Sequence, residues 1–268
     1  MQCHLIKKNG DIILIIIIIG NDNDRIRLYL ANGSNPWHYD LGGEVLSVAI
    51  SDDSKFIAAG SSDNIIYLFD RDGGVLQWSN STGNDVVDVA ISKNGTTVAG
   101  ISGSKLLVFS TTGNGTPLWT TDLGVTLTSV EVSKDGNYIY AIGGTKVALF
   151  HRSNATAVWT STTSSTVDFL SVSDSGMYAV VTASNEAYLY KNSSSVAFWK
   201  YTLSDEVNSL SISGDGTQVS ISDNSKRFYF YKTDSVNSGW SYRTHELVRG
   251  VSLYSDSSKL LVAVQDKI

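Results

Sequence analysis

Side chains that could carry out acid–base or metal chemistry are few and scattered in this sequence. The four histidines lie far apart, at His4, His38, His151 and His245, and the single cysteine is Cys3. A metal site needs His, Cys or carboxylate groups at set spacings, so we expect none here. G-x-S-x-G, H-E-x-x-H, Walker and dinucleotide-binding motifs are all missing. The expectation is therefore no catalytic residue, no metal ion and no bound cofactor.

Carboxylates are the remaining candidates for chemistry. Most of them, such as the pair Asp205 and Glu206, fall at predicted turns, where a solvated charge is expected. Three others lie inside strand-like segments instead: Asp88, Glu131 and Asp168. Such a carboxylate either binds a ligand or is hydrogen-bonded by neighbouring polar groups, and we expect the second.

Residues 21–24 (Asn-Asp-Asn-Asp) lack the glycine and the distal glutamate of a calcium-binding loop. We therefore expect a polar hairpin turn there.

A sequence repeat reveals the strands that must position these side chains. All six tryptophans recur at intervals of 41, 41, 40, 40 and 41 residues, at Trp37, Trp78, Trp119, Trp159, Trp199 and Trp240. A period of 40 to 45 residues with four strand-sized segments per period is typical of a β-propeller blade. One tryptophan per blade at a fixed strand position predicts packing between blades rather than a ligand-binding ring.

Each repeat has the same internal order of strands. The first strand alternates apolar and smaller or polar residues and ends in a polar turn; it is expected at residues 45–51, 86–92, 127–133, 167–173 and 207–213. The third strand has an aromatic residue near its end, and the fourth carries the tryptophan. No segment has a helical period, so the fold class is all-β.

We predict one domain, residues 1–268, folded as a β-propeller of four-stranded antiparallel blades. The repeat predicts seven blades with an incomplete last blade, because the chain ends where a third strand should begin. In the six-bladed alternative, residues 26–30 and 36–40 would complete the C-terminal blade. In either fold, Asp88, Glu131 and Asp168 are candidate polar residues at the edge of the central channel.

The incomplete blade has a consequence for its second strand, residues 259–264 (KLLVAV). A free sheet edge is normally covered or blunted. We expect cover from a longer native polypeptide, from the N-terminal outer hairpin or from a partner's strand. In each case Leu261 and Ala263 should not face water.

The repeat resembles WD-repeat-like and quinoprotein-like propellers. The residues that carry the likeness are VSKDG at 132–136, the aromatic third strands, and Asp70, Gly74 and Trp78 spaced as in the tryptophan-docking turn of quinoprotein blades. The resemblance implies that the tryptophan packs between adjacent blades, and it assigns no activity to any residue. The Gly-His and Trp-Asp dipeptides of WD repeats are missing.

An unbroken apolar run at residues 12–19 is too short to span a bilayer. Its place in the repeat predicts a buried second strand. The alternatives are the remnant of a targeting segment, although no small-x-small cleavage site follows, or an error in the sequence.

Composition restricts the partners. The net charge is −6, and no run of cations exceeds Lys7-Lys8, so neither nucleic-acid binding nor docking on an anionic membrane is expected. We also expect no membrane insertion. Six N-x-S/T sequons are candidate N-glycan acceptors: Asn32, Asn80, Asn94, Asn114, Asn154 and Asn192.

We therefore expect a non-enzymatic binding or scaffold module that contacts a protein partner or a second copy of itself. A cell-surface or extracellular location is favoured, and a cytoplasmic one is the alternative. The alternative function is a quinoprotein- or lyase-like enzyme. That function requires carboxylates that converge with a cation or cofactor at one mouth of the channel.

Overall fold

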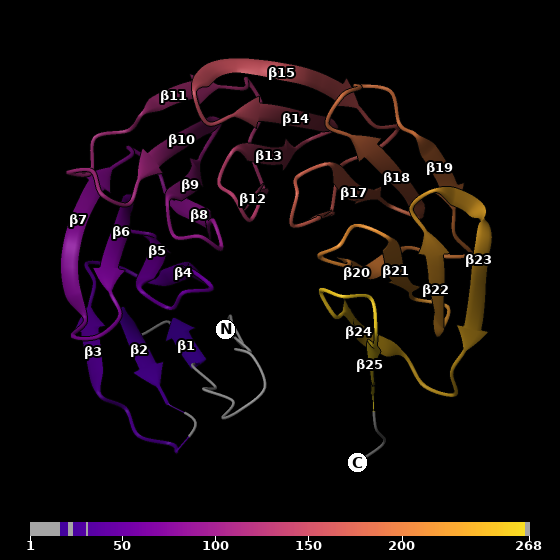
Figure 1. The fold of residues 1–268 in the computed structure, drawn as a ribbon, viewed down its shortest axis with the longest axis horizontal. Helices are drawn as coiled ribbons and strands as arrows, with labels where there is room; N and C mark the ends of the chain where they lie inside the picture. The colour runs from indigo at the N-terminus through magenta and orange to yellow at the C-terminus, as the bar shows by residue number, and fades with distance from the viewer. Residues whose placement is uncertain (1–16, 21–23, 31, 266–268) are drawn as a thin grey trace. The chain divides into compact units, whose positions relative to one another are not determined.

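The computed structural model describes residues 17–20, 24–30 and 32–265. Throughout these residues the regular elements are β-strands, which form seven antiparallel sheets (Figure 1). The chain divides into two compact units, Met1–Asn137 with Arg152–Thr156 and Tyr138–His151 with Ala157–Ile268. None of the residues described forms a helix with the length and apolarity needed to cross a membrane.

The first unit contains three sheets, of order β1-β2-β3, β4-β5-β6-β7 and β11-β10-β9-β8. Its strands are β1 (Ile17–Gly20), β2 (Arg25–Tyr29), β3 (Trp37–Asp40), β4 (Val45–Ile50), β5 (Phe56–Ser61), β6 (Ile65–Asp70), β7 (Val75–Ser81), β8 (Val86–Ile91), β9 (Thr97–Ser102), β10 (Lys105–Ser110), β11 (Trp119–Asp122) and β12 (Ser129–Val132).

The second unit contains the sheets β16-β17-β18-β19, β20-β21-β22-β23 and β24-β25, while the sheet of order β12-β13-β14-β15 has strands from both units. The remaining strands are β13 (Tyr138–Gly143), β14 (Lys146–His151), β15 (Asn154–Thr162), β16 (Phe169–Val172), β17 (Tyr178–Ala183), β18 (Glu186–Lys191), β19 (Trp199–Thr202), β20 (Val207–Ile212), β21 (Gln218–Asp223), β22 (Arg227–Lys232), β23 (Ser235–Arg243), β24 (Val248–Leu253) and β25 (Leu260–Val264).

Burial changes from strand to strand within a sheet. All six residues of β9 are buried, and so are five of the six in β5. The outer strand β7 alternates between exposed and covered residues. Apolar residues dominate these middle strands, because an unsatisfied polar side chain is costly in a strand that is covered on both faces.

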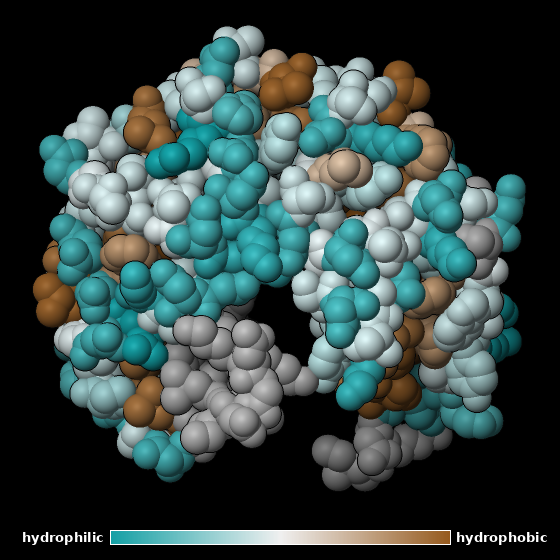
Figure 2. Space-filling view, viewed as in Figure 1, coloured by the Kyte–Doolittle hydropathy of each residue, from teal (hydrophilic) through white to brown (hydrophobic). Residues whose placement is uncertain are grey.

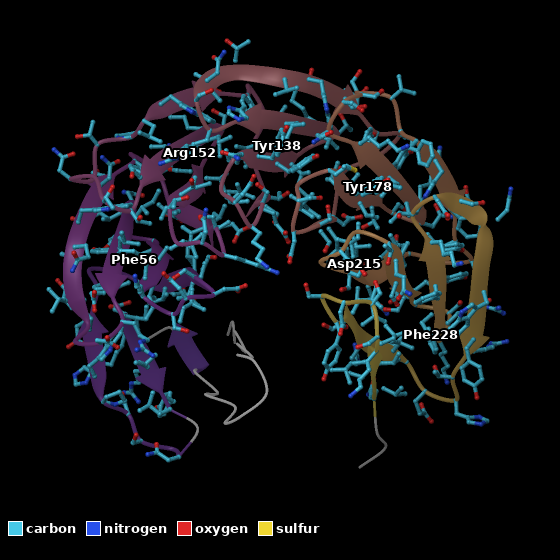
Figure 3. The ribbon with its side chains drawn as sticks, viewed as in Figure 1. Phe56, Tyr138, Arg152, Tyr178, Asp215 and Phe228 are labelled. Carbon is cyan, nitrogen blue, oxygen red and sulfur yellow. The ribbon has the colours of Figure 1, made fainter. Side chains whose placement is uncertain are left out.

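Short polar turns link successive first-to-second-strand hairpins. The amide of Asp52 donates to the carbonyl of Lys93 at 3.0 Å, and the amide of Asn94 donates to Lys134 at 3.0 Å. In the second unit the amide of Asp215 (Figure 3) donates to the carbonyl of Ser255 at 2.7 Å. Each turn is thus tied through its backbone to the turn one repeat later.

The predicted fold class is confirmed: the described chain is an all-β propeller of antiparallel blades with a two-stranded last blade, β24-β25. The six-bladed alternative is wrong, because β2 pairs with β1 and β3, as in Leu28 opposite Ile18 and Trp37. Within the isoleucine run, residues 17–19 lie in β1, the expected second strand.

Several expectations concern residues outside the described ranges. These are Cys3, His4, the Lys7-Lys8 pair, residues 12–16 of the apolar run, residues 21–23 of the acidic turn and the terminal residues 266–268.

The cover expected for the last sheet is not seen within the described residues. There Leu261 is 58% exposed, Ala263 is also exposed, and β25 pairs only with β24. Cover from a longer native polypeptide or from a partner's strand stays a prediction.

Candidate interaction surface

The tryptophans lie on the fourth strands, where five of the six are covered. Trp78, Trp159 and Trp199 are at most 9% exposed, and Trp37 and Trp119 are half-buried. Trp37, Trp159 and Trp199 lie tilted against an aromatic ring of the following sheet, and Trp78 stacks on Phe109 at 5.0 Å between ring centroids. Trp240 differs, with 51% of its surface exposed.

Four of the indole N–H groups donate to a backbone carbonyl in the next outer turn. The bonds run from Trp37 to Arg71 (2.6 Å), from Trp119 to Arg152 (2.7 Å; Figure 3), from Trp159 to Asn192 (3.0 Å) and from Trp199 to Thr233 (3.3 Å). Trp78 is the exception: its indole nitrogen is buried without an acceptor. Ring packing and these bonds together join one sheet to the next.

Asp88 connects three first strands of the first unit. Its Oδ1 accepts from the Ser47 hydroxyl at 2.8 Å and its Oδ2 accepts from the Ser129 hydroxyl at 2.9 Å. The amides of Val89 and Val130 donate to the same two oxygens. Loss of hydration raises the pKa of Asp88 although these hydrogen bonds oppose the rise. The carboxylate is saturated by its own neighbours.

The other two candidate channel-edge carboxylates differ from Asp88 in burial. Glu131 is partly buried on β12. Asp168 is exposed ahead of β16 in the second unit, and its Oδ2 accepts from the amide of Ser184 at 2.8 Å. The described residues contain no group of three His, Cys, Asp or Glu side chains that could hold a metal ion.

Two grooves occupy equivalent places in the repeat, along the loops that lead into the first strands. The first, of about 320 Å³, lies in the first unit and is lined by Asn64, Gly83, Asn84, Asp85, Val87, Gly103, Thr126 and Leu127. The second, of about 400 Å³, lies in the second unit and is lined by Ser165, Thr166, Asp168, Phe169, Ser184, Glu206 and Val207. The lining of each groove includes a carboxylate, Asp85 in the first and Asp168 and Glu206 in the second, and no Lys or Arg.

A threonine fixes the loop at each groove. The hydroxyl of Thr82 donates to the carbonyls of Asn64 and Asn84 at 2.9 and 2.8 Å. In the second unit the hydroxyl of Thr163 makes the same pair of contacts, with the carbonyls of Thr145 and Ser165. These hydrogen bonds restrict the conformations open to the loops that border the grooves.

The position four residues after each tryptophan alternates in type around the repeat: Leu41, Thr82, Leu123, Thr163, Leu203 and Thr244. This alternation is readable in the sequence, and sequence reasoning missed it. Thr82 and Thr163 lie in loops that border the two grooves, whereas Thr244 makes the same pair of contacts, with the carbonyls of Lys226 and Glu246, in a loop that lines neither.

Acid–tyrosine pairs provide a second kind of loop anchor. Glu186 accepts hydrogen bonds from Ser164 and Tyr188 and forms an ion pair with Lys200 at 2.6 Å. Lys200, Ser164 and Tyr188 together lower the pKa of Glu186 to about 2. Because Ser164 precedes the second groove, this carboxylate ties the groove's loop to β18.

Asp63 and Asp223 act in the same way in two other sheets. Asp63 accepts from Tyr67 and from the amide of Gly42. Asp223 accepts from Tyr229, whose oxygen in turn accepts from the amide of Ser204.

The candidate glycan acceptors differ in how their amide nitrogens are used. Asn80 donates to the carbonyl of Gly115 and Asn94 donates to that of Asp135, both at 2.9 Å. Asn32, Asn114 and Asn154 are exposed. In each of these three the Oδ1 accepts from the amide two residues later, which turns the amide nitrogen outward in an Asx-turn.

Comparison with known proteins decides the family. Residues 15–201 match the family model described as outer membrane protein assembly factor BamB. The chain belongs to this family. No curated protein matches the BamB-like chain. Its matched segment includes the first groove, Asp88 and five of the six tryptophans.

Solved structures extend the likeness to the whole fold. A chain in the crystal structure of the mitotic checkpoint complex, a WD40-like propeller, matches with a TM-score of 0.75 and 12% identity. The match covers 94% of the BamB-like chain and 81% of the other. In all, 1840 chains of solved structures match, so the fold alone does not specify a function.

Proposed function

We propose that this BamB-like propeller is a non-enzymatic scaffold that binds other proteins through the loops along its two grooves. The observation that carries the proposal is the pair of equivalent grooves with loops fixed by Thr82 and Thr163. A preformed surface loses little conformational entropy on binding. The second groove presents Asp168 and Glu206, which suits a partner segment that carries Lys or Arg.

A non-catalytic role agrees with the state of the candidate carboxylates. A catalytic acid or base must reach its substrate, whereas both oxygens of Asp88 are occupied by hydrogen bonds from Ser47, Ser129 and two backbone amides. Asp168 accepts a hydrogen bond from its own sheet's turn.

We propose a location outside the cytoplasm, at a cell surface or in an extracellular assembly. The family description, an outer membrane protein assembly factor, supports this location. An exported chain would meet glycosylation enzymes, and the exposed Asn32, Asn114 and Asn154 are the acceptors we propose.

The experiment is affinity capture from the native source with a charge-reversed groove. The double variant Asp168→Lys/Glu206→Lys should lose a partner that the parent retains. Asp234→Lys, an equivalent reversal in the exposed turn between β22 and β23, is the matched control and should retain it. Identical capture by the parent and both variants would contradict the proposal.

A further inference from the structure

Asn-Gly dipeptides allow an asparagine side chain to react with its own backbone. The amide nitrogen of the glycine attacks Cγ of the asparagine, and glycine has no Cβ to hinder the approach. The chain contains four such dipeptides, at Asn9, Asn32, Asn94 and Asn114. The first lies outside the described residues. Ser or Thr follows the glycine in each of the other three, so their local sequences are closely matched.

Exposure does not separate the three described asparagines. Each is exposed, and hydrophilic residues are spread over the surface of both units (Figure 2). The Oδ1 of each accepts a hydrogen bond from the amide two residues later, at 3.0 Å for Asn32, 3.1 Å for Asn94 and 3.2 Å for Asn114. This bond polarises the side-chain carbonyl in all three cases, so it does not favour one of them.

The glycine amide, which supplies the attacking nitrogen, does separate them. The amide of Gly33 donates to the carbonyl of Leu30 at 2.8 Å, and that of Gly95 donates to the carbonyl of Ser92 at 2.9 Å. Within the part of the chain that the structure describes, the amide of Gly115 donates to no carbonyl or side chain. A bonded amide must first lose its hydrogen bond before its nitrogen can attack. The structure therefore protects Gly33 and Gly95 from this reaction but not Gly115.

The rest of Gly115 is held against β7 in the first unit. Its carbonyl accepts a hydrogen bond from the side-chain amide of Asn80 at 2.9 Å. Its φ is 84°, and an added Cβ would lie 2.8 Å from the carbonyl oxygen of Ser79, which favours glycine at this position. The loop between β10 and β11 (Figure 1) thus keeps a glycine with an unbonded amide directly after Asn114.

We infer that Asn114 is a site of spontaneous deamidation. The nitrogen of Gly115 forms a bond to Cγ of Asn114, and Nδ2 leaves as ammonia with the proton from the Gly115 amide. A water molecule then adds to either carbonyl of the cyclic imide and opens it, giving aspartate or isoaspartate. The net reaction consumes one water and releases one ammonia. It places a new carboxylate in the loop between β10 and β11.

Deamidation and glycosylation compete for the same side chain. Asn114, Gly115 and Thr116 also form a sequon, and a glycan is attached through Nδ2 of the asparagine. Deamidation removes this nitrogen and with it the acceptor. A glycan attached first occupies the nitrogen, which then cannot leave as ammonia. Each modification of Asn114 should therefore exclude the other.

The test uses the whole chain, made in a host that adds no N-glycans and incubated at mildly alkaline pH. Peptide mass spectrometry gives the rate of deamidation at Asn32, Asn94 and Asn114, in the folded protein and in urea. In urea the three rates should be similar. In the folded protein Asn114 should react faster than the other two by about fivefold or more, the factor that corresponds to one backbone hydrogen bond of about 1 kcal/mol. Equal rates at the three sites of the folded protein, or a slower reaction at Asn114 than at Asn94, would overturn the inference.

Two variants are the controls, and thermal melts check that each keeps its fold. Asn114→Gln should abolish the fast reaction, because attack on the longer side chain must form a larger ring, and should leave the rates at Asn32 and Asn94 unchanged. In a glycosylating host, Thr116→Ala removes the sequon but keeps the Asn-Gly dipeptide, so it should deamidate at Asn114 while the glycosylated parent does not. A glycosylated parent that deamidates as fast as Thr116→Ala would contradict the competition.

Discussion

The indole N–H of Trp159 donates to the backbone carbonyl of Asn192, one sheet further along the chain, at 3.0 Å. Trp78 holds the same repeat position and is as well buried, yet its indole nitrogen has no acceptor. The two residues therefore differ in one hydrogen bond within a shared packing arrangement. This difference allows the contribution of the bond to be measured apart from that of the ring.

Trp159→Phe should destabilise the protein by about 1–2 kcal/mol more than Trp78→Phe does. Both changes remove the same ring atoms, but only the first leaves the carbonyl of Asn192 without its donor. Urea unfolding gives the two free energies of unfolding. Equal losses would show that the indole–carbonyl bond does not stabilise the joint between sheets.

Trp199→Ala should cost about 3–5 kcal/mol, as large-to-small changes in a core do, because Trp199 is 7% exposed. Trp240→Ala should change the free energy of unfolding by only about 0.5 kcal/mol, the range of surface substitutions. Both free energies of unfolding are measured on the protein alone. A large loss for Trp240→Ala would mean that its ring is covered in solution.

Asp88→Asn should cost about 1–3 kcal/mol, because one amide group would face the N–H of Val130 and leave a buried donor unsatisfied. Asp72→Asn is the control at an exposed carboxylate, 78% of which faces solvent, and it should be nearly neutral. Thermal and urea unfolding report both. If Asp88→Asn is also neutral, Asp88 does not join the three first strands.

Acid should weaken the anchor at Glu186 in a defined window. Its hydrogen bonds with Lys200, Ser164 and Tyr188 hold the folded-state pKa near 2, below the unfolded value of about 4.3. A depressed carboxylate pKa stabilises the fold above the unfolded value, and this contribution is lost as pH falls toward 2. The difference in Tm between the parent and Glu186→Gln should therefore shrink toward zero as the pH falls from about 4.5 to about 2. Glu44→Gln, at an exposed carboxylate, is the control whose gap should stay constant.

Glycan occupancy should be selective if the chain is secreted from a glycosylating host. Asn32, Asn114 and Asn154 keep an outward amide nitrogen, whereas those of Asn80 and Asn94 donate to backbone carbonyls. Glycopeptide mass spectrometry should find the first three sites more occupied than the last two. Higher occupancy at Asn80 or Asn94 would contradict the structural basis of this selection.

The architecture could be predicted from the sequence because tryptophan spacing and period-two alternation are local signals. The first strand predicted at residues 207–213, for example, is observed as β20, Val207–Ile212. The contacts of Asp88 could not be predicted, because Ser47 and Ser129 lie 41 residues away on other strands. The grooves were likewise missed, because they are formed by loops of two successive repeats that lie far apart in the sequence. Cover of Leu261 stays a prediction, since a repeat pattern shows what a strand normally pairs with and not which chain supplies that partner.

Three different amino acids accept the indole bonds, all through the backbone carbonyl: Arg71 and Arg152, Asn192 and Thr233. The acceptor in each bond is a main-chain oxygen that every amino acid possesses. Replacing the accepting residue therefore keeps the acceptor, whereas replacing the tryptophan removes the donor. The two sides of each joint between sheets should thus differ in how well they tolerate substitution.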